Sequence, residues 1–286
     1  MANLKEIRNR ITSIGSTMQI TSAMKMVSAA KLKKAQDAIT AMRPYSSKLT
    51  ELLQNLSASL DSEVSGKYSE QREVKNVLLV VVTSNRGLCG GFNSNVIKET
   101  VKTIKTDFSG AKVNLVTIGK KGNDILSKTY DVIKNRNDVF DDLTFEVIEE
   151  IAENLMQLFV DGKYDRIELV YNRFKNAATQ IPTVEQFLPI KPIEVENAST
   201  SDYIFQPSKE EIVLALIPKS LKTQLYKAVR DSYAAEHGAR MTAMHKATDN
   251  AKELRDDLKL TYNKARQAAI TNEILEIVGG AEALKN

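Results

Sequence analysis

The chain has 286 residues, 42% hydrophobic and 27% charged, a composition typical of a soluble protein that buries a core. Its single cysteine, Cys89, excludes a disulfide framework and a thiolate metal site, and two histidines, His237 and His245, offer little for a histidine-based metal site or triad. The net charge of +4 divides into +6 for residues 1–43, −5 for the middle and +3 for residues 219–286, so the basic ends favour nucleic acid or an acidic protein surface as partner.

The first 43 residues contain no proline, which permits one long helix. Its apolar residues repeat at spacings of three and four, as in a coiled coil: Leu4, Ile7, Ile11, Ile14 and Met18. Polar residues then interrupt the repeat: Thr21, Lys25 and Ser28. We therefore expect the apolar stripe to move to Ile20, Met24 and Val27. Because the helical pattern resumes after Pro44, residues 1–60 are predicted as a coiled-coil helix, and the polar residues 61–74 as a loop.

The middle of the chain, residues 75–195, alternates strands with helices. The expected strands are the apolar runs at residues 76–84, 112–119 and 165–172, and the expected helices are residues 93–105 and 143–160. This alternation predicts a small, Rossmann-like α/β domain with a mainly parallel sheet.

A glycine-rich turn, "SNRGLCGGFN" at residues 84–93, follows the first expected strand. Glycines before a helix can admit a phosphate, but the turn is neither G-x-G-x-x-G nor a Walker A loop. A turn whose glycines serve packing or a protein contact is favoured over a nucleotide site. For Cys89, a small buried hydrophobe is favoured over a reactive thiol. The second glycine pair, in residues 119–122, is interpreted as a solvated turn.

The C-terminal segment follows a linker at residues 196–208 and is predicted as a helix over residues 209–286. Ser208 and Glu211 form a capping box at its start. Such a helix, roughly 110 Å long at 1.5 Å per residue, requires a partner. The N-terminal helix is the obvious one, and it would pair antiparallel. The C-terminal helix is longer by about 19 residues, so its apolar tip "AAITNEILEIVGGAEAL" should project as a single helix that something else covers.

Four segments together closely resemble the gamma subunits of bacterial F-type ATP synthases: "ITSAMKMVSAAKLKKAQ", "SNRGLCGGFN", "ARMTAMHKATDNA" and "YNKARQAAITNEILEIVGGAEAL". The resemblance covers essentially the whole chain in the right order. The residues that look like the family signature are Ile270, Thr271, Glu273, Glu276, Gly280 and Ala281.

The resemblance implies an α/β fold in which a long antiparallel coiled coil carries an inserted small α/β domain. It implies the central rotor shaft, which couples proton-driven rotation of the c ring to conformational cycling of the catalytic beta subunits. The implied partners are the alpha and beta subunits, the epsilon subunit and the c ring, with no nucleic acid. The shaft would have no catalytic residue, cofactor or metal of its own. It would lie at the cytoplasmic face of the bacterial inner membrane as a peripheral subunit.

The resemblance also assigns contact residues. Contact with the beta subunits is expected for four residues: Met24, Lys25, Arg266 and Gln267. Contact with the c ring or epsilon is expected for Tyr203 and Phe205. Relatives often carry an acid where this chain has Gln206, so a charge-based role there is not expected.

Three rival functions share some of these features. A nucleotide-dependent enzyme would use a crevice at the carboxyl ends of the strands. A nucleic-acid-binding coiled coil would use the basic ends, although residues 219–286 also carry nine acids. A static tether would share the coiled coil but would tolerate a truncated tip.

Overall fold

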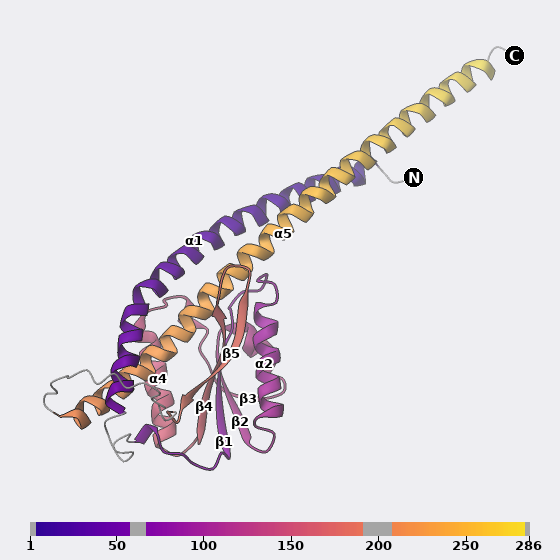
Figure 1. Ribbon diagram of the computed structural model, residues 1–286. Coiled ribbons are helices and arrows are strands. Elements are labelled where there is room, and N and C mark those ends of the chain that lie inside the picture. The colour runs from indigo at the N-terminus through magenta and orange to yellow at the C-terminus, as the bar shows by residue number, and fades with distance from the viewer. Residues whose placement is uncertain (1–3, 58–66, 191–207, 284–286) are drawn as a thin grey trace. The chain divides into compact units, whose positions relative to one another are not determined.

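The computed structural model describes residues 4–57, 67–190 and 208–283 (Figure 1). Contacts divide the chain into two compact units, residues 1–28 with 241–286 and residues 29–240. We call them the paired-helix unit and the α/β unit. Two long helices, α1 (Leu4–Ser57) and α5 (Lys209–Ala283), each contribute to both units. The predicted fold class, long terminal helices around a small α/β domain, is confirmed.

Both long helices continue through a proline. Pro44 lies inside α1 and Pro218 lies inside α5, so neither ends its helix. At the start of α5, the Ser208 hydroxyl accepts a hydrogen bond from the Glu211 backbone N–H at 3.2 Å, which confirms the serine half of the predicted capping box. Most of the predicted loop and linker, residues 61–66 and 196–207, lies outside the described residues.

The α/β unit contains a five-stranded sheet in the order β3-β2-β1-β4-β5. Its strands are β1 (Asn76–Val82), β2 (Lys112–Ile118), β3 (Asp131–Asn135), β4 (Arg166–Phe174) and β5 (Gln180–Leu188). All neighbours are parallel except β4 and β5, which pair antiparallel. The mainly parallel sheet is therefore confirmed, and two edge strands, β3 and β5, are added to those predicted.

Helices cover both faces of the sheet (Figure 1). On one face, Leu78, Val80 and Val82 of β1 pack with α4 (Phe145–Val160) and with the α5 segment around Leu225. On the other, the alternate β1 residues pack with α2 (Phe92–Thr106) and the end of α3 (Lys120–Leu126). Because β1 is buried on both faces, residues 77–82 are all apolar and do not alternate with polar residues. A short 3-10 helix, η2 (Asp138–Phe140), precedes α4.

Candidate functional site

The glycine-rich turn between β1 and α2 is closed by hydrogen bonds of its own side chains. Asn93 accepts one from the Ser84 backbone N–H at 2.9 Å and donates one to the Cys89 Sγ at 3.3 Å. Cys89 is only 2% exposed, and burial raises the pKa of its thiol. The interpretation of Cys89 as a small buried hydrophobe is therefore confirmed, since a reactive thiol needs exposure and a lowered pKa.

The second glycine pair was predicted wrongly as a solvated turn. Gly119 and Gly122 are buried against Thr83 at the end of β1. A Cβ on Gly119 would lie 2.2 Å from the Thr83 carbonyl oxygen, and the Gly122 N–H donates to the Thr83 hydroxyl at 2.8 Å. These glycines therefore allow the two strand-to-helix turns to touch, while Lys120 remains exposed.

Within the α/β unit, α5 packs against the glycine-rich turn through a buried ion pair. Arg240 donates to the Glu236 carboxylate at 2.6 Å and to the carbonyl oxygens of Arg86 at 2.9 Å and Gly87 at 3.3 Å. Both charged side chains are 9% exposed. Burial raises the pKa of Glu236, and the Arg240 guanidinium opposes that rise. Removing either partner would leave the other charge buried and unpaired, which is costly. The ion pair therefore holds the glycine-rich turn against α5.

Small residues let α5 approach the turn closely. Ala235 and Ala239 form a buried cluster with Cys89 and Phe92. One residue away, a Cβ on Gly238 would lie 3.1 Å from the Cα of Ala177, so only glycine fits there without displacement. The close contact of α5 with the rest of the α/β unit therefore depends on the small size of Ala235, Gly238 and Ala239.

This contact occupies the place where doubly wound folds usually bind ligands. That place is the crevice at the carboxyl ends of the strands where the strand order reverses, here between β1 and β4. Phe92, from the turn after β1, packs with Ala235 and Ala239 of α5, and its carbonyl accepts a hydrogen bond at 2.9 Å from Asn172 near the end of β4. Because side chains of the chain itself meet here, the turn serves packing, as favoured from its sequence.

In the paired-helix unit, α1 and α5 run antiparallel. The hydroxyls of Thr21 and Thr248 lie 2.8 Å apart. Further along, Arg255 donates to the sulfur of Met18 at 3.7 Å, so residue numbers rise along one helix as they fall along the other. The antiparallel pairing predicted for the terminal helices is therefore seen in this unit.

The predicted shift of the apolar stripe in α1 is wrong. Thr21 and Ser28, where the stripe was expected to leave the interface, are 9% and 2% exposed. Ile20 and Val27, which were expected to replace them, are 61% and 57% exposed. The heptad seam thus continues through small polar residues. Their hydroxyls tolerate burial because they hydrogen-bond, Ser28 to the Met24 carbonyl at 2.7 Å and Thr21 to Thr248.

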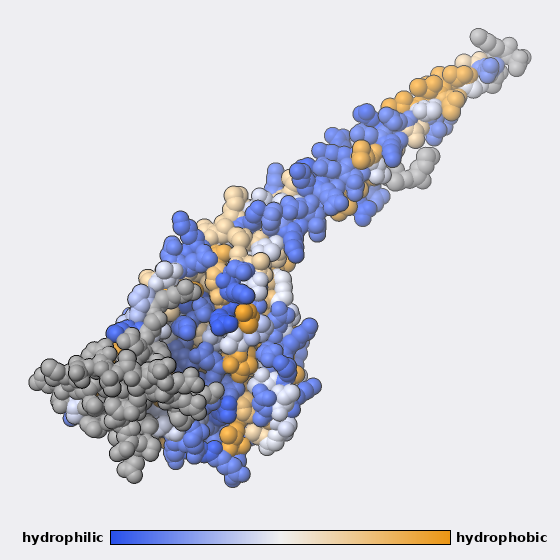
Figure 2. Space-filling model, viewed as in Figure 1, coloured by the Kyte–Doolittle hydropathy of each residue, from blue (hydrophilic) through white to orange (hydrophobic). Residues whose placement is uncertain are grey.

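The last turns of α5 form an apolar surface (Figure 2). Its exposed large residues are Ile270 at 47%, Ile274 at 54%, Leu275 at 63%, Ile277 at 71% and Val278 at 55%. The remaining signature residues are exposed as well: Thr271, Glu273, Glu276, Gly280 and Ala281. Within the described residues, the tip projects as expected, and its exposed apolar area is typical of an interaction surface.

The predicted beta-contact residues fall at two separate places in the paired-helix unit. Met24 and Lys25 are half-buried, and the Lys25 Nζ lies 3.4 Å from the Nδ1 of His245. Arg266 and Gln267 are exposed and lie about 21 residues beyond His245 on α5, roughly 30 Å away. The structure therefore does not gather them into one site. Tyr203, Phe205 and Gln206 lie outside the described residues.

The buried pair Glu236–Arg240 was not foreseen from the sequence. Its spacing of four residues is common on exposed helix faces, so the charges alone gave no sign of burial. Gly238 between them was the available signal, because a glycine inside a helix costs about 1 kcal/mol against alanine unless something approaches closely.

Within residues 4–57, 67–190 and 208–283, no helix has the length and apolar character needed to cross a membrane. Within the same residues, no three acidic, histidine or cysteine side chains come together as potential metal ligands.

Comparison with known proteins gives one consistent family. The sequence model described as ATP synthase matches residues 3–284. The ATP synthase gamma chain of Flavobacterium johnsoniae is 74% identical over 286 residues, 99% of each chain. That of Flavobacterium psychrophilum is 73% identical over 100% of each chain.

Solved structures agree. A chain in the central stalk and c-ring structure of the Tetrahymena thermophila mitochondrial ATP synthase is 28% identical, with a TM-score of 0.59 over 80% of this chain and 99% of that one. A chain in a Euglena gracilis mitochondrial ATP synthase structure reaches a TM-score of 0.69 over 98% of this chain and 94% of that one. Its 22% identity makes it a likeness of fold.

Proposed function

The chain belongs to the ATP synthase family as a gamma chain, the central stalk of the F-type rotor, and from that premise we propose that it turns as a shaft without catalysing a reaction itself. Its partners are the alpha and beta subunits of the hexamer, the epsilon subunit and the c ring. The chain is part of a membrane-associated complex. The finer location, peripheral at the cytoplasmic face of the bacterial inner membrane, is part of the proposal.

The contact between α5 and the glycine-rich turn is the observation that carries this proposal. Within the α/β unit, Arg240 and Glu236 hold α5 to the glycine-rich turn, and Gly238 packs closely on the β4–β5 hairpin. The same helix continues as far as Ala283 without interruption. In a rotor, torque applied to the α/β unit would therefore pass into α5 directly, with no loop between them. The crevice that an enzyme of this fold would keep for its substrate is used for this contact.

The proposed faces of the shaft follow from exposure and charge. The basic Lys25 and its neighbour Met24 would meet acidic surfaces of the beta subunits in turn, giving attractions that form and break as the shaft rotates. Arg266 and Gln267 would do the same nearer the tip. The apolar tip would turn in a sleeve of the hexamer, where few directional bonds oppose sliding. Tyr203 and Phe205 are proposed to contact the c ring or epsilon because of their place in the family.

Single-molecule rotation tests the proposal. The chain would be assembled with the alpha–beta hexamer and carry a bead on a cysteine introduced at Ser94, which is exposed on α2. The native Cys89 is unsuitable because its thiol is buried. Unidirectional stepping on addition of ATP is the expected result.

Other outcomes decide between the rivals. Binding of the chain to the hexamer without rotation would favour a static tether over a rotating shaft. ATP hydrolysis by the purified chain, free of hexamer, would overturn the non-catalytic assignment. Salt-sensitive binding of DNA to the chain would favour the nucleic-acid alternative.

A further inference from the structure

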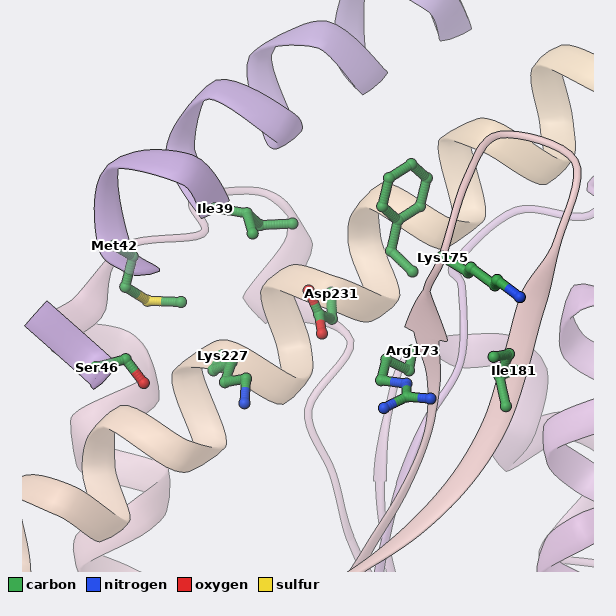
Figure 3. Close-up of a pocket in the computed structure, with 9 residues that line it drawn as sticks. Ile39, Met42, Ser46, Arg173, Lys175, Ile181, Lys227 and Asp231 are labelled. Carbon is green, nitrogen blue, oxygen red and sulfur yellow. The ribbon is translucent and has the colours of Figure 1, made fainter. Parts of the chain in front are cut away.

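A pocket in the α/β unit is lined by residues that lie outside the glycine-rich turn. It has a volume of about 570 Å³ and is formed by α1, the β4–β5 hairpin and α5. In Figure 3, Ile39 and Met42 extend from α1 toward α5, where Asp231 lies, and Arg173 and Ile181 belong to the hairpin. Its size is within the range of about 300–1,000 Å³ usual for small-molecule sites.

Three exposed cations line this pocket: Arg173, Lys175 and Lys227. Within the described parts of the chain, none of the three has an ion pair or a side-chain hydrogen bond. Some other cations of the unit are paired, as Lys222 is with Glu149 at 2.7 Å. Cations outnumber acids in this lining, and an excess of like charge is unfavourable, so the pocket favours an anion.

The pocket carries one acid, Asp231, which is 8% exposed. Three cations and one carboxylate leave a formal charge of +2. A dianion would neutralise the charge of +2, whereas a monocarboxylate, with a single negative charge, would leave +1. A phosphomonoester carries between −1.5 and −2 charges at neutral pH, with a second pKa of about 6, and arginine and lysine are its usual ligands.

The rest of the lining is one hydroxyl residue, Ser46, and four apolar side chains: Ile39, Met42, Phe174 and Ile181. Ile39 is 6% exposed, so the α1 wall is part of the packed interior. A pocket with an apolar wall and a cationic rim suits a ligand that has an apolar body and a charged head.

We propose that this pocket binds a small phosphomonoester, with its phosphate held by Arg173 and Lys227 and its apolar body against Ile39 and Met42. The proposal does not depend on the rotor assignment, because the pocket, its charge and its lining are independent of what the shaft does. It would give the α/β unit a site through which a soluble phosphorylated metabolite binds the stalk.

The test uses the full-length chain at pH 8, where a phosphomonoester is a dianion. Phenyl phosphate, inorganic phosphate and benzyl alcohol serve as probes in titration calorimetry and phosphorus NMR. Phenyl phosphate is expected to bind best, because inorganic phosphate lacks the apolar body and benzyl alcohol lacks the charge. Lowering the pH to 5 should weaken binding of phenyl phosphate as the dianion takes up a proton.

Arg173→Glu and Lys227→Glu are each expected to weaken phenyl phosphate binding about tenfold or more. The matched control is Lys98→Glu, an exposed lysine on α2 outside the pocket, which should change the affinity less than about twofold. The uncharged Arg173→Gln and Lys227→Gln variants repeat the test should a reversed charge disturb folding, which circular dichroism would show.

Four outcomes would overturn the proposal. They are no binding of phenyl phosphate at millimolar concentration, equal loss in Lys98→Glu, undiminished binding in the folded Arg173 and Lys227 variants, and equal affinity for benzyl alcohol. Binding of vesicles containing phosphatidic acid, without binding of phenyl phosphate, would reject a soluble ligand in favour of a lipid headgroup.

Discussion

His237 is a buried histidine without a polar partner. It is 5% exposed on α5, and within the described residues neither of its ring nitrogens has a hydrogen bond. Its ring meets that of Tyr233 edge to face, with centroids 4.5 Å apart. Burial, with Arg240 and Lys31 nearby, lowers the pKa of His237 to about 3 from 6.5. The fold therefore holds this histidine neutral.

A pH dependence follows, with a definite sign. Between pH 6.5 and 3 the unfolded chain binds a proton at His237 that the folded chain does not. The free energy of unfolding is therefore undiminished above pH 6.5 and falls by roughly 1.4 kcal/mol per pH unit below it. Replacing His237→Phe keeps an aromatic ring beside Tyr233 and removes this slope, so the variant should be more stable by about 2 kcal/mol at pH 5.

Urea unfolding of the full chain at pH 7.5, 6 and 5 measures this effect. His245→Gln is the matched control, since His245 is the other histidine and is exposed. It should leave the slope nearly unchanged. The same slope in His237→Phe and in the unmodified chain would show that His237 is not the group responsible.

At the scale of elements, the packing of α5 on the β4–β5 hairpin depends on Gly238. Alanine is normally the better helix former by about 1 kcal/mol. Here the added Cβ would lie 3.1 Å from the Cα and 3.2 Å from the carbonyl oxygen of Ala177, a backbone neighbour that cannot simply rotate away. Overpacking costs about 1–3 kcal/mol, so Gly238→Ala should destabilise the chain by about 1 kcal/mol. Chemical denaturation measures the change.

Gly279 provides the opposite case. It also lies inside α5, but no atom lies within 4 Å of where its Cβ would be. Gly279→Ala should therefore increase helicity and lower neither stability nor solubility. If Gly238→Ala and Gly279→Ala changed the free energy of unfolding equally, the close approach of Gly238 to Ala177 would not contribute to stability.

The elements that the sequence predicts well are those with long apolar runs. β1 and α4 have such runs, and both were predicted near their observed bounds. β5 was missed because it contains Pro182, which reads as a strand breaker. That proline is tolerated because β5 pairs only with β4 and lies at the sheet edge. The α1 stripe was misassigned because hydropathy places Thr21 and Ser28 outside, whereas the helix pair buries them for their small size.

For the whole molecule, the resemblance of four segments identified the family, and the apolar repeats predicted long terminal helices. The Arg240–Glu236 contact could not be predicted, because it joins α5 to a turn about 150 residues away in sequence. The pocket residues were not found for the same reason. Arg173 and Lys175 belong to the β4–β5 hairpin and Lys227 to α5, and nothing in the sequence brings these two segments together.

A prediction at the scale of the complex concerns Met24. Met24→Lys adds a charge beside Lys25 on the face proposed to meet the beta subunits. An extra charge interaction of about 1 kcal/mol would change the rate of a release step roughly fivefold. We expect ATP hydrolysis to continue while proton pumping per ATP falls. The measurement is acidification of inverted membrane vesicles, compared with phosphate release.

Met24→Leu serves as the uncharged control, because it preserves the apolar volume, and its pumping per ATP should be normal. Unchanged pumping in Met24→Lys would remove Met24 from the proposed contact. A similar loss in both variants would point to packing within the helix pair instead of charge.

The single-helix end of α5 has a consequence for assembly. The segment from Ile270 to Ala283 continues α5 and needs no helix nucleus of its own, but its exposed apolar residues and two glycines weaken this end of the helix. We expect its last turns to fray in the free chain and to become fully ordered on insertion, as coupled folding and binding. The entropy lost in ordering the segment opposes association, so its affinity for the surrounding subunits is lower than the buried area alone suggests. The end of α5 would therefore be retained by the surrounding subunits while still able to turn. Amide hydrogen exchange of residues 270–283 should become slower only once the subunit is assembled.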